Sequence, residues 1–290
     1  MNKDAIAIAR IKRASEIAQA RGMGPLYVGY SGGKDSTVLA DLAIRAGVPI
    51  EIAHSHTTID APETVYFVRR EMARFEAYGN AKCTVYMPRY KGKPVSMWTL
   101  IPQKLMPPTR VVRYCTSVLK QSHSAGRFSL TGVRWDESAR RKKHAVYLRH
   151  HTGTRKKRLR LTSDQGNLTA LTEAKGELIC NPIVDWTEAD VWDYIRDRHL
   201  PYNQLYDEGC KRIGCIGCPL AGKHRWTEFA RWPAYGKLYI MAFDWMISAR
   251  KAVGKRCEWE TGRDVFHWWM EDGVLLGQIE MEDILDAVTL

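Results

Sequence analysis

The chain has 290 residues, of which 45% are apolar and 26% charged, a composition typical of a globular protein with a sizeable core. It has no apolar run near the roughly 20 residues that cross a bilayer, and its start lacks the apolar block of a secretion signal, so we expect a cytoplasmic protein with no membrane partner. The 44 Lys and Arg against 32 Asp and Glu give a net charge of +12, which favours polyanionic partners such as nucleic acid or a multi-phosphate substrate.

The first predicted element is an amphipathic helix over residues 3–21, a stretch without Gly or Pro. Buried strands and helices then alternate. The predicted strands lie at 26–30, 50–54, 83–87 and 128–134, and the helices between them at 36–46 and 62–78. A further helix begins at a capping box of Thr187 and Asp190. This alternation predicts an α/β fold with a doubly wound parallel sheet covered on both faces.

Two segments differ from this pattern. Residues 139–160 hold most of the surplus positive charge and predict an exposed hairpin or loop, part of a basic insertion over about 139–178. It either neutralises nucleic-acid phosphates or is a solvated loop without a partner. After about residue 205 the tail is rich in Trp, Met and Tyr and is expected to be helical. We therefore predict an α/β domain at 1–205 and a helical, cysteine-containing subdomain at 206–290.

The stretch GYSGGKDSTVL (29–39) stands between the first predicted strand and the next helix. A P-loop of the kinase kind is excluded, because Asp35 follows Lys34 and the required upstream glycine is missing. Glycines here let the backbone approach an anion, the helix N-terminus attracts it, and Lys34 adds a point charge. The plainer alternative is a glycine turn between strand and helix. The candidate phosphate-binding residues are Ser31, Gly32, Gly33, Lys34, Asp35 and Ser36.

This loop resembles the SGGxDS loop of the PP-loop ATP pyrophosphatases, the adenine nucleotide alpha hydrolase superfamily. The resemblance implies their fold and a site for ATP and Mg²⁺ in the α/β domain. It also implies that ATP is cleaved between the α and β phosphates. Lys34 and Asp35 are then expected to act in catalysis, with Lys34 and the loop amides stabilising the leaving pyrophosphate.

Further stretches resemble the phosphoadenosine phosphosulfate (PAPS) reductase branch of that superfamily. They are APETVYFV (61–68), TRVVRYCTSVLK (109–120), GVRWDESARR (132–141) and NPIVDWTEADVWDYI (181–195). Their order and spacing match that branch over much of the chain.

Cationic residues within these stretches are candidates for nucleotide binding. Arg113 and Lys120 bracket Cys115 at separations that let all three face one site on a helix. Arg134 follows a strand, where parallel sheets place ligand-binding residues, and we also expect it to act in catalysis. Arg140 lies close behind, and both arginines suit bidentate phosphate contacts. The alternative for each arginine is a solvated surface charge.

The stretch GCKRIGCIGCPL (209–220) places Cys210, Cys215 and Cys218 at a spacing typical of metal binding. Reductases of this branch that hold a [4Fe–4S] cluster use an RYCC-like segment and a later C-x2-C pair. This chain has RYCT, so the resemblance implies that Cys115 is one ligand and that Cys210 replaces the missing neighbour. Zinc and unligated thiols are the alternatives to an iron–sulfur cluster.

The reductases act through a cysteine in a C-terminal Glu-Cys-Gly-Leu-His tail, whereas the last cysteine here, Cys257, stands in KRCEWETG. An adenylating enzyme with a cluster and a basic surface instead resembles the DNA phosphorothioation sulfurtransferases and, less closely, the tRNA thiolases. We therefore expect adenylation of a nucleic-acid oxygen, DNA rather than tRNA, and its replacement by sulfur. A cysteine desulfurase or other sulfur donor, and partner subunits of a DNA-modification complex, are the implied partners. The alternatives are a reductase of adenylylated sulfate and a non-catalytic nucleotide- and DNA-binding subunit.

Overall fold

The structure is a computed structural model that describes residues 2–120, 123–124, 126–138, 141–143, 146–150, 159–161 and 177–271. The chain forms two compact units, each built from separate segments. The first unit comprises the described residues of Met1–Ser55, Pro62–Tyr86 and His123–Ile213. The second comprises those of His56–Ala61, Met87–Ser122 and Gly214–Leu290. This division differs from the predicted one, since the second unit begins at 214 and takes in 87–122.

A mixed sheet forms the centre of the first unit. Its parallel strands stand in the order β3-β2-β1-β6-β9, which confirms the predicted doubly wound parallel arrangement. The bounds are β1 (Leu26–Gly29), β2 (Ile50–Ser55), β3 (Ala81–Tyr86), β6 (Phe128–Leu130) and β9 (Glu177–Cys180). The predicted strand at 128–134 is shorter in the structure, because β6 ends at Leu130 and residues 131–134 have no regular secondary structure.

Two antiparallel strands complete this sheet. Within the expected basic insertion, β7 (Tyr147–His150) pairs with β9, and β8 (Leu159–Leu161) pairs with β7. Most other residues of 139–178 lie outside the described residues, so the role expected for the insertion is not tested here.

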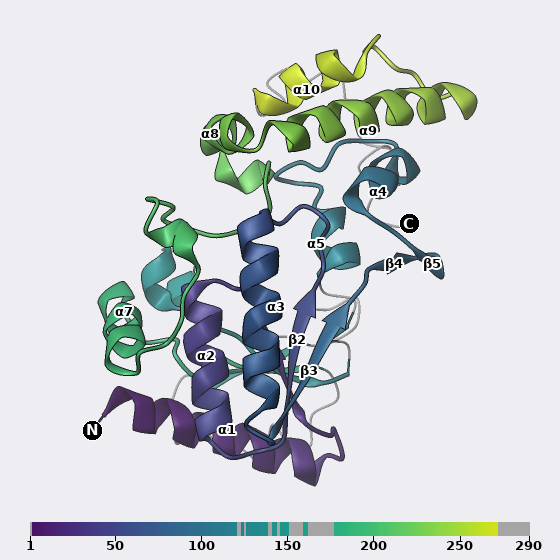
Figure 1. Cartoon of the computed structure of the whole chain (residues 1–290). Helices are drawn as coiled ribbons and strands as arrows, with labels where there is room; N and C mark the ends of the chain where they lie inside the picture. Colours follow the sequence, from purple (N-terminus) through teal and green to yellow (C-terminus); the bar gives the residue numbers. More distant parts are fainter. Residues whose placement is uncertain are drawn as a thin grey trace. The chain divides into compact units, whose positions relative to one another are not determined.

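Helices cover the sheet of the first unit. They are α1 (Lys3–Ala20), α2 (Lys34–Arg45), α3 (Pro62–Glu76) and α7 (Glu188–Asp197), with short 3-10 turns η1 (Trp135–Glu137), η2 (Arg141–Lys143) and η3 (Gln204–Tyr206). Helix α2 connects β1 to β2, and α3 connects β2 to β3. Because both connections are right-handed crossovers in the same direction along the sheet, the two helices lie on one face of it, as Figure 1 shows. The predicted capping box is confirmed, since the Thr187 hydroxyl accepts from the Asp190 N–H at 3.2 Å.

The second unit is mainly helical. Its elements are the short strands β4 (Arg89–Tyr90) and β5 (Lys93–Pro94) and the helices α4 (Met97–Lys104), α5 (Tyr114–Leu119), η4 (Pro219–Ala221), α8 (His224–Arg231), α9 (Pro233–Ala252) and α10 (Gly262–Met270). Tyr239, Phe243 and Trp269 form a buried aromatic core between α9 and α10.

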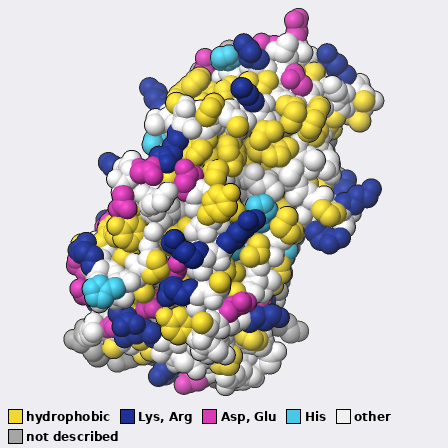
Figure 2. Space-filling model, viewed as in Figure 1, with side chains coloured by type: hydrophobic (Ala, Val, Ile, Leu, Met, Phe, Trp, Pro, Cys, Tyr) yellow, Lys and Arg dark blue, Asp and Glu magenta, His cyan; other side chains and the backbone are white. Residues whose placement is uncertain are grey.

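Exposed apolar side chains gather on part of the second unit's surface. Figure 2 shows apolar side chains gathered over α8 and α9, where Trp226, Met241 and Trp245 are exposed. Among the described residues, no helix is both long and apolar enough to cross a membrane.

Candidate active site

The loop between β1 and α2 has a conformation that its glycines and hydroxyl residues dictate. Gly32 has φ +75, and a Cβ there would lie 2.8 Å from Cγ2 of Val68, so a larger residue would be strained and would clash. The hydroxyl of Ser36 donates to the Gly33 carbonyl at 2.8 Å and lies 3.1 Å from that of Ser31. These contacts fold the loop back over the first turn of α2.

Helix α2 begins at Lys34, directly after the glycine pair. The N–H groups of its first turn have no acceptor within the helix, and the helix dipole makes this end partly positive. The predicted strand, glycine turn and helix N-terminus are therefore all present, in the order that anion binding requires.

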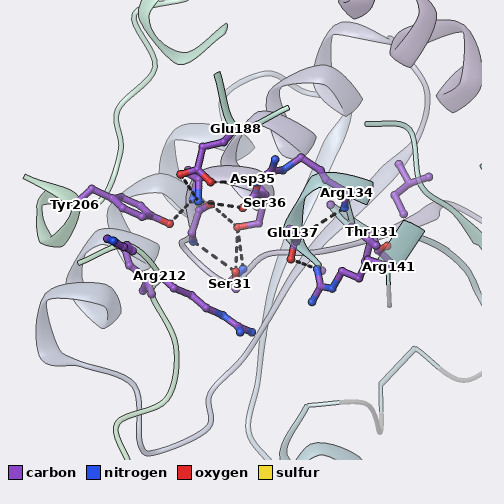
Figure 3. A pocket seen from close by; sticks show the side chains of 18 residues that line it. Ser31, Asp35, Ser36, Thr131, Arg134, Glu137, Arg141, Glu188, Tyr206 and Arg212 are labelled. Carbon is purple, nitrogen blue, oxygen red and sulfur yellow. Dashed lines mark hydrogen bonds and ion pairs between the residues drawn. The ribbon is translucent and has the colours of Figure 1, made fainter. Parts of the chain in front are cut away.

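The position of this loop within the sheet supports a ligand site. β1 and β6 are neighbours, and the chain leaves them toward different sides, which in open α/β sheets opens a crevice beyond the carboxyl ends of the strands. A cavity of about 500 Å³ lies there, entirely within the first unit (Figure 3). Its lining includes Gly29, Ser31, Gly33, Lys34, Asp35, Ser36, Leu130, Thr131, Gly132, Val133, Arg134, Glu137, Arg141, Glu188, Tyr206, Lys211, Arg212 and Ile213.

Arg134 joins the end of β6 to the start of α2. Its side chain is almost completely buried, and its Nε donates to Oδ1 of Asp35 at 2.6 Å. The close approach depends on Gly132, because a Cβ at that position would lie 3.2 Å from the Asp35 carbonyl oxygen. The guanidinium also lies 3.8 Å from Glu188. Arg134 is therefore an oriented cation and not a solvated surface charge.

Lys34 is the second buried cation, with only 6% of the residue exposed. Its Nζ lies 3.6 Å from Oδ2 of Asp35 and 3.7 Å from Oε1 of Glu188. The same carboxylates thus hold Lys34 and Arg134 together. Among the described lining residues, five cationic side chains face three carboxylates, an excess of two positive charges that suits a polyphosphate.

Several lining residues were not predicted from sequence. Glu188 and Tyr206 contact Lys34, while Lys211 and Arg212 add positive charge to the cavity wall. Glu188 lies in the first turn of α7, directly after the predicted cap, and the Lys-Arg pair is visible in GCKRIGC. Tyr206 could not be predicted from local sequence, because 172 residues separate it from Lys34.

The structure places only some of the predicted nucleotide-binding residues at this cavity. Ser31, Gly33, Lys34, Asp35, Ser36 and Arg134 line one cavity, and Gly32 shapes the loop. Arg140 lies outside the described residues, although the neighbouring Arg141 lines the cavity and pairs with Glu137. Arg113 and Lys120 belong to the second unit and are not among the described lining residues.

The second unit brings three of the predicted metal ligands near one another. Tyr239 interacts electrostatically with Cys115, Cys215 and Cys218. Burial raises the pKa of the Cys215 thiol to about 11, although the nearby Lys120 ammonium opposes this shift. The Cys215 thiolate in turn raises the pKa of Lys120. A buried cation among thiols is the charge environment that thiolate ligands need.

The donor chemistry therefore suits a thiolate-bound metal centre, but the side chains do not form a closed ligand shell. Within the described part of the chain, no group of three or more His, Cys, Asp or Glu side chains converges closely enough to hold a metal ion. Sγ of Cys215 instead donates to Oδ1 of Asp60 at 3.7 Å. The fourth predicted ligand, Cys210, belongs to the first unit. The four-cysteine ligand set stays a prediction.

Comparison with known proteins places this chain in a family. Residues 25–221 match the phosphoadenosine phosphosulfate reductase domain. The chain is 27% identical over 266 residues to the uncharacterized protein MJ0973 of Methanocaldococcus jannaschii, which covers 87% of this chain and 55% of that protein. The chain thus spans about half the length of this curated relative.

Solved structures with a similar chain path have low sequence identity to this chain. The PAPS reductase of Candida auris has 21% identity and a TM-score of 0.44, over 70% of this chain and 87% of that one. The U34-tRNA thiolase of Methanococcus maripaludis, solved with its [4Fe–4S] cluster, has 16% identity and a TM-score of 0.41, over 88% and 82% of the two chains. Because the domain match covers more than half of the sequence, this chain belongs to the phosphoadenosine phosphosulfate reductase domain family.

Proposed function

We propose that this protein is an ATP-dependent sulfurtransferase that adenylates an oxygen of a nucleic acid, most simply a DNA backbone phosphate, so that sulfur can replace that oxygen. The observation that carries the proposal is the SGGKDS loop at the sheet's switch point, where Lys34 and the buried Arg134 face a cationic cavity. A site with these groups fits a triphosphate that leaves as pyrophosphate.

The residues of the cavity account for the first half of this reaction. The acceptor oxygen attacks the α phosphorus, an oxygen–phosphorus bond forms, and the α–β bond breaks with its electron pair leaving on pyrophosphate. The first-turn amides of α2 that follow Lys34 and the Lys34 ammonium bind that pyrophosphate and stabilise its growing charge. Arg134, oriented by Asp35, supplies the second cation. Mg²⁺, when bound with ATP, would neutralise further phosphate charge.

In the second half, sulfur at the sulfide level attacks the adenylated phosphorus, and AMP departs with the original oxygen. We propose that Cys115, Cys215 and Cys218, with Cys210, hold a [4Fe–4S] cluster. Such a cluster would supply a soft metal site for sulfur when bound. Lys120 would balance part of the thiolate charge in this setting.

The proposed partners follow from charge and stoichiometry. A chain with net charge +12 attracts nucleic acid, and Lys211 and Arg212 place cations at the cavity wall. Each turnover consumes one sulfur atom, so a cysteine desulfurase or another donor is required. A desulfurase delivers this sulfur as a persulfide, so a thiol reductant that is oxidised to a disulfide is also required to release it at the sulfide level. Partner subunits of a DNA-modification complex belong to the same proposal.

One assay tests the function against its rivals. Anaerobically purified protein is incubated with α-labelled ATP and Mg²⁺, with DNA, tRNA, sulfate or no acceptor, and AMP and pyrophosphate are measured. AMP release that depends on DNA supports the proposal, and release that depends on tRNA moves the substrate to RNA.

The family match favours a second candidate, a sulfonucleotide reductase. Sulfite formed from adenylylated sulfate with a thiol donor and without ATP turnover would establish that activity instead. No turnover under any condition, together with retained nucleotide binding, would indicate a non-catalytic subunit.

A further inference from the structure

A tyrosine from a distant segment contacts the phosphate loop at the N-terminus of α2. The hydroxyl of Tyr206, the last residue of η3, accepts a hydrogen bond from the backbone N–H of Lys34 at 3.0 Å. The Lys34 Nζ lies 5.3 Å from the centre of the same ring. Figure 3 shows the hydroxyl directed at the loop from the side opposite Arg134. Tyr206 thus occupies one of the first-turn amides that anion sites of this kind use.

The surrounding residues fix the position of this ring. Trp192 packs edge-on against it, with centroids 5.2 Å apart and an interplanar angle of 90°. The turn that carries the ring is anchored by Asn203, whose side chain accepts from the Leu205 N–H at 3.1 Å and donates to the Thr64 hydroxyl at 3.0 Å. The hydroxyl is therefore held in place before any ligand arrives.

The hydroxyl also retains a proton to donate. Burial raises the pKa of Tyr206 to about 12, so the phenol is neutral near pH 7. Its oxygen accepts from Lys34, and no hydrogen bond from this hydroxyl to an acceptor occurs among the described residues. The neighbouring Lys34 and Arg212 side chains are donors only and cannot accept it. The carboxylates of Asp35 and Glu188 act on the phenol through their charge, but among the described residues neither accepts a hydrogen bond from it. A neutral donor in a cavity with excess positive charge suits an anionic acceptor.

We propose that Tyr206 is a pyrophosphate-binding residue, whose hydroxyl keeps its bond from Lys34 and donates to an oxygen of the leaving diphosphate. The inference deepens the proposed function and rests on it. No proton is transferred, since the phenol acts as a fixed hydrogen-bond donor that strengthens as charge develops on the departing group. Tyr206 would thereby replace the Lys34 amide as the hydrogen-bond donor that reaches the ligand.

The test compares Tyr206→Phe with Tyr202→Phe in the full chain. The control is closely matched, because Tyr202 also packs edge-on against Trp192 but gives its hydroxyl to Asp207 and does not line the cavity. Binding of inorganic pyrophosphate and of AMP is measured by calorimetry, and thermal unfolding reports stability. We expect Tyr206→Phe to weaken pyrophosphate binding about tenfold or more, the usual effect of losing a hydrogen bond to a charged group. AMP binding and the Tyr202→Phe variant should be unaffected.

Other results would overturn the inference. Unchanged pyrophosphate affinity in Tyr206→Phe would mean that the hydroxyl does not reach the ligand. Tighter binding would mean that it blocks the Lys34 amide and must be displaced. Equal weakening of pyrophosphate and AMP would indicate a purely structural role. If the wild-type protein itself binds no pyrophosphate, the proposed function fails together with this inference, a result distinct from the other three.

Discussion

Nε of Arg134 lies 2.6 Å from Oδ1 of Asp35, although 99 residues separate the two in sequence. Arg134 follows β6 and Asp35 lies in the first turn of α2, so this ion pair joins the two segments that diverge at the switch point. The arginine is almost completely buried, whereas the carboxylate is one-quarter exposed. The pair holds the phosphate loop against the sheet and fixes the direction of a cation that faces the ligand cavity.

Replacing this arginine should therefore affect both stability and binding. We expect Arg134→Ala to lower the free energy of unfolding by about 2 kcal/mol, because the partly buried Asp35 carboxylate loses its hydrogen-bonded partner and keeps only the more distant Lys34 ammonium. Urea denaturation measures the loss. The control is Arg196→Ala, which removes an exposed ion pair with Asp193 and should cost less than about 1 kcal/mol. Equal effects of the two substitutions would contradict the structural role given to Arg134.

Replacing Lys34 should affect turnover more than folding. The ammonium faces the cavity beside Asp35 and Glu188, where the leaving diphosphate would develop charge. Lys34→Ala should slow AMP and pyrophosphate release by about 100-fold or more, in line with other electrostatic groups of this kind. The exposed Lys82, on β3, is the control, and Lys82→Ala should keep full activity. A folded Lys34→Ala protein with wild-type turnover would refute the assigned role.

Local sequence was enough to predict the strand, loop and helix around Gly32, since these elements depend on residues within a dozen positions. The capping box at Thr187 is equally local, and it was also predicted correctly. Tyr206 was not, because its position beside Lys34 depends on how a turn 172 residues away packs within the first unit. The extent of the second unit differs from the predicted subdomain for the same reason. Its α4 packs on α9, a tertiary contact between segments that the sequence does not mark as neighbours.

Comparing Gly32 in the phosphate loop with Gly79 elsewhere separates two costs of adding a side chain, the steric clash and the backbone strain. Gly32 and Gly79 have nearly equal φ values, +75 and +76, but only Gly32 faces a close neighbour, Val68. Gly79→Ala should therefore cost about 1 kcal/mol of stability from backbone strain alone. Gly32→Ala should cost about 1 to 3 kcal/mol more, because its methyl group meets Cγ2 of Val68 at 2.8 Å.

A double variant separates the two contributions. Adding Val68→Ala to Gly32→Ala should recover part of the steric cost but none of the backbone strain. The readout is the free energy of unfolding from urea titrations of four proteins. They are the wild type, Gly32→Ala, Val68→Ala and the double variant. Strictly additive effects of the two substitutions would show that the contact does not limit this position.

The proposed cluster can be tested through its metal content. Protein purified anaerobically should contain iron and absorb broadly in the visible range, and Cys218→Ser should remove both, because a thiolate ligand is lost. Cys257→Ser is the control, since this thiol instead donates to the Trp259 carbonyl at 3.6 Å. Zinc without iron in the wild-type protein would rule out the cluster, and iron retained in Cys218→Ser would exclude that residue as a ligand.

Salt dependence can show whether nucleic acid lies against the cavity wall. Lys211 and Arg212 line the cavity, whereas Lys12 and Arg13 form an equally adjacent, exposed pair on α1. If each cavity cation neutralises one phosphate, replacing both with Ala should reduce the slope of log K against log salt for duplex DNA by about 2, since each contact contributes about 0.9. The same double replacement of Lys12 and Arg13 removes an equal charge from α1 and should leave the slope nearly unchanged. An equal reduction in both variants would indicate that the net charge of +12 attracts DNA without a defined path, and would argue against a nucleic-acid substrate bound at this cavity.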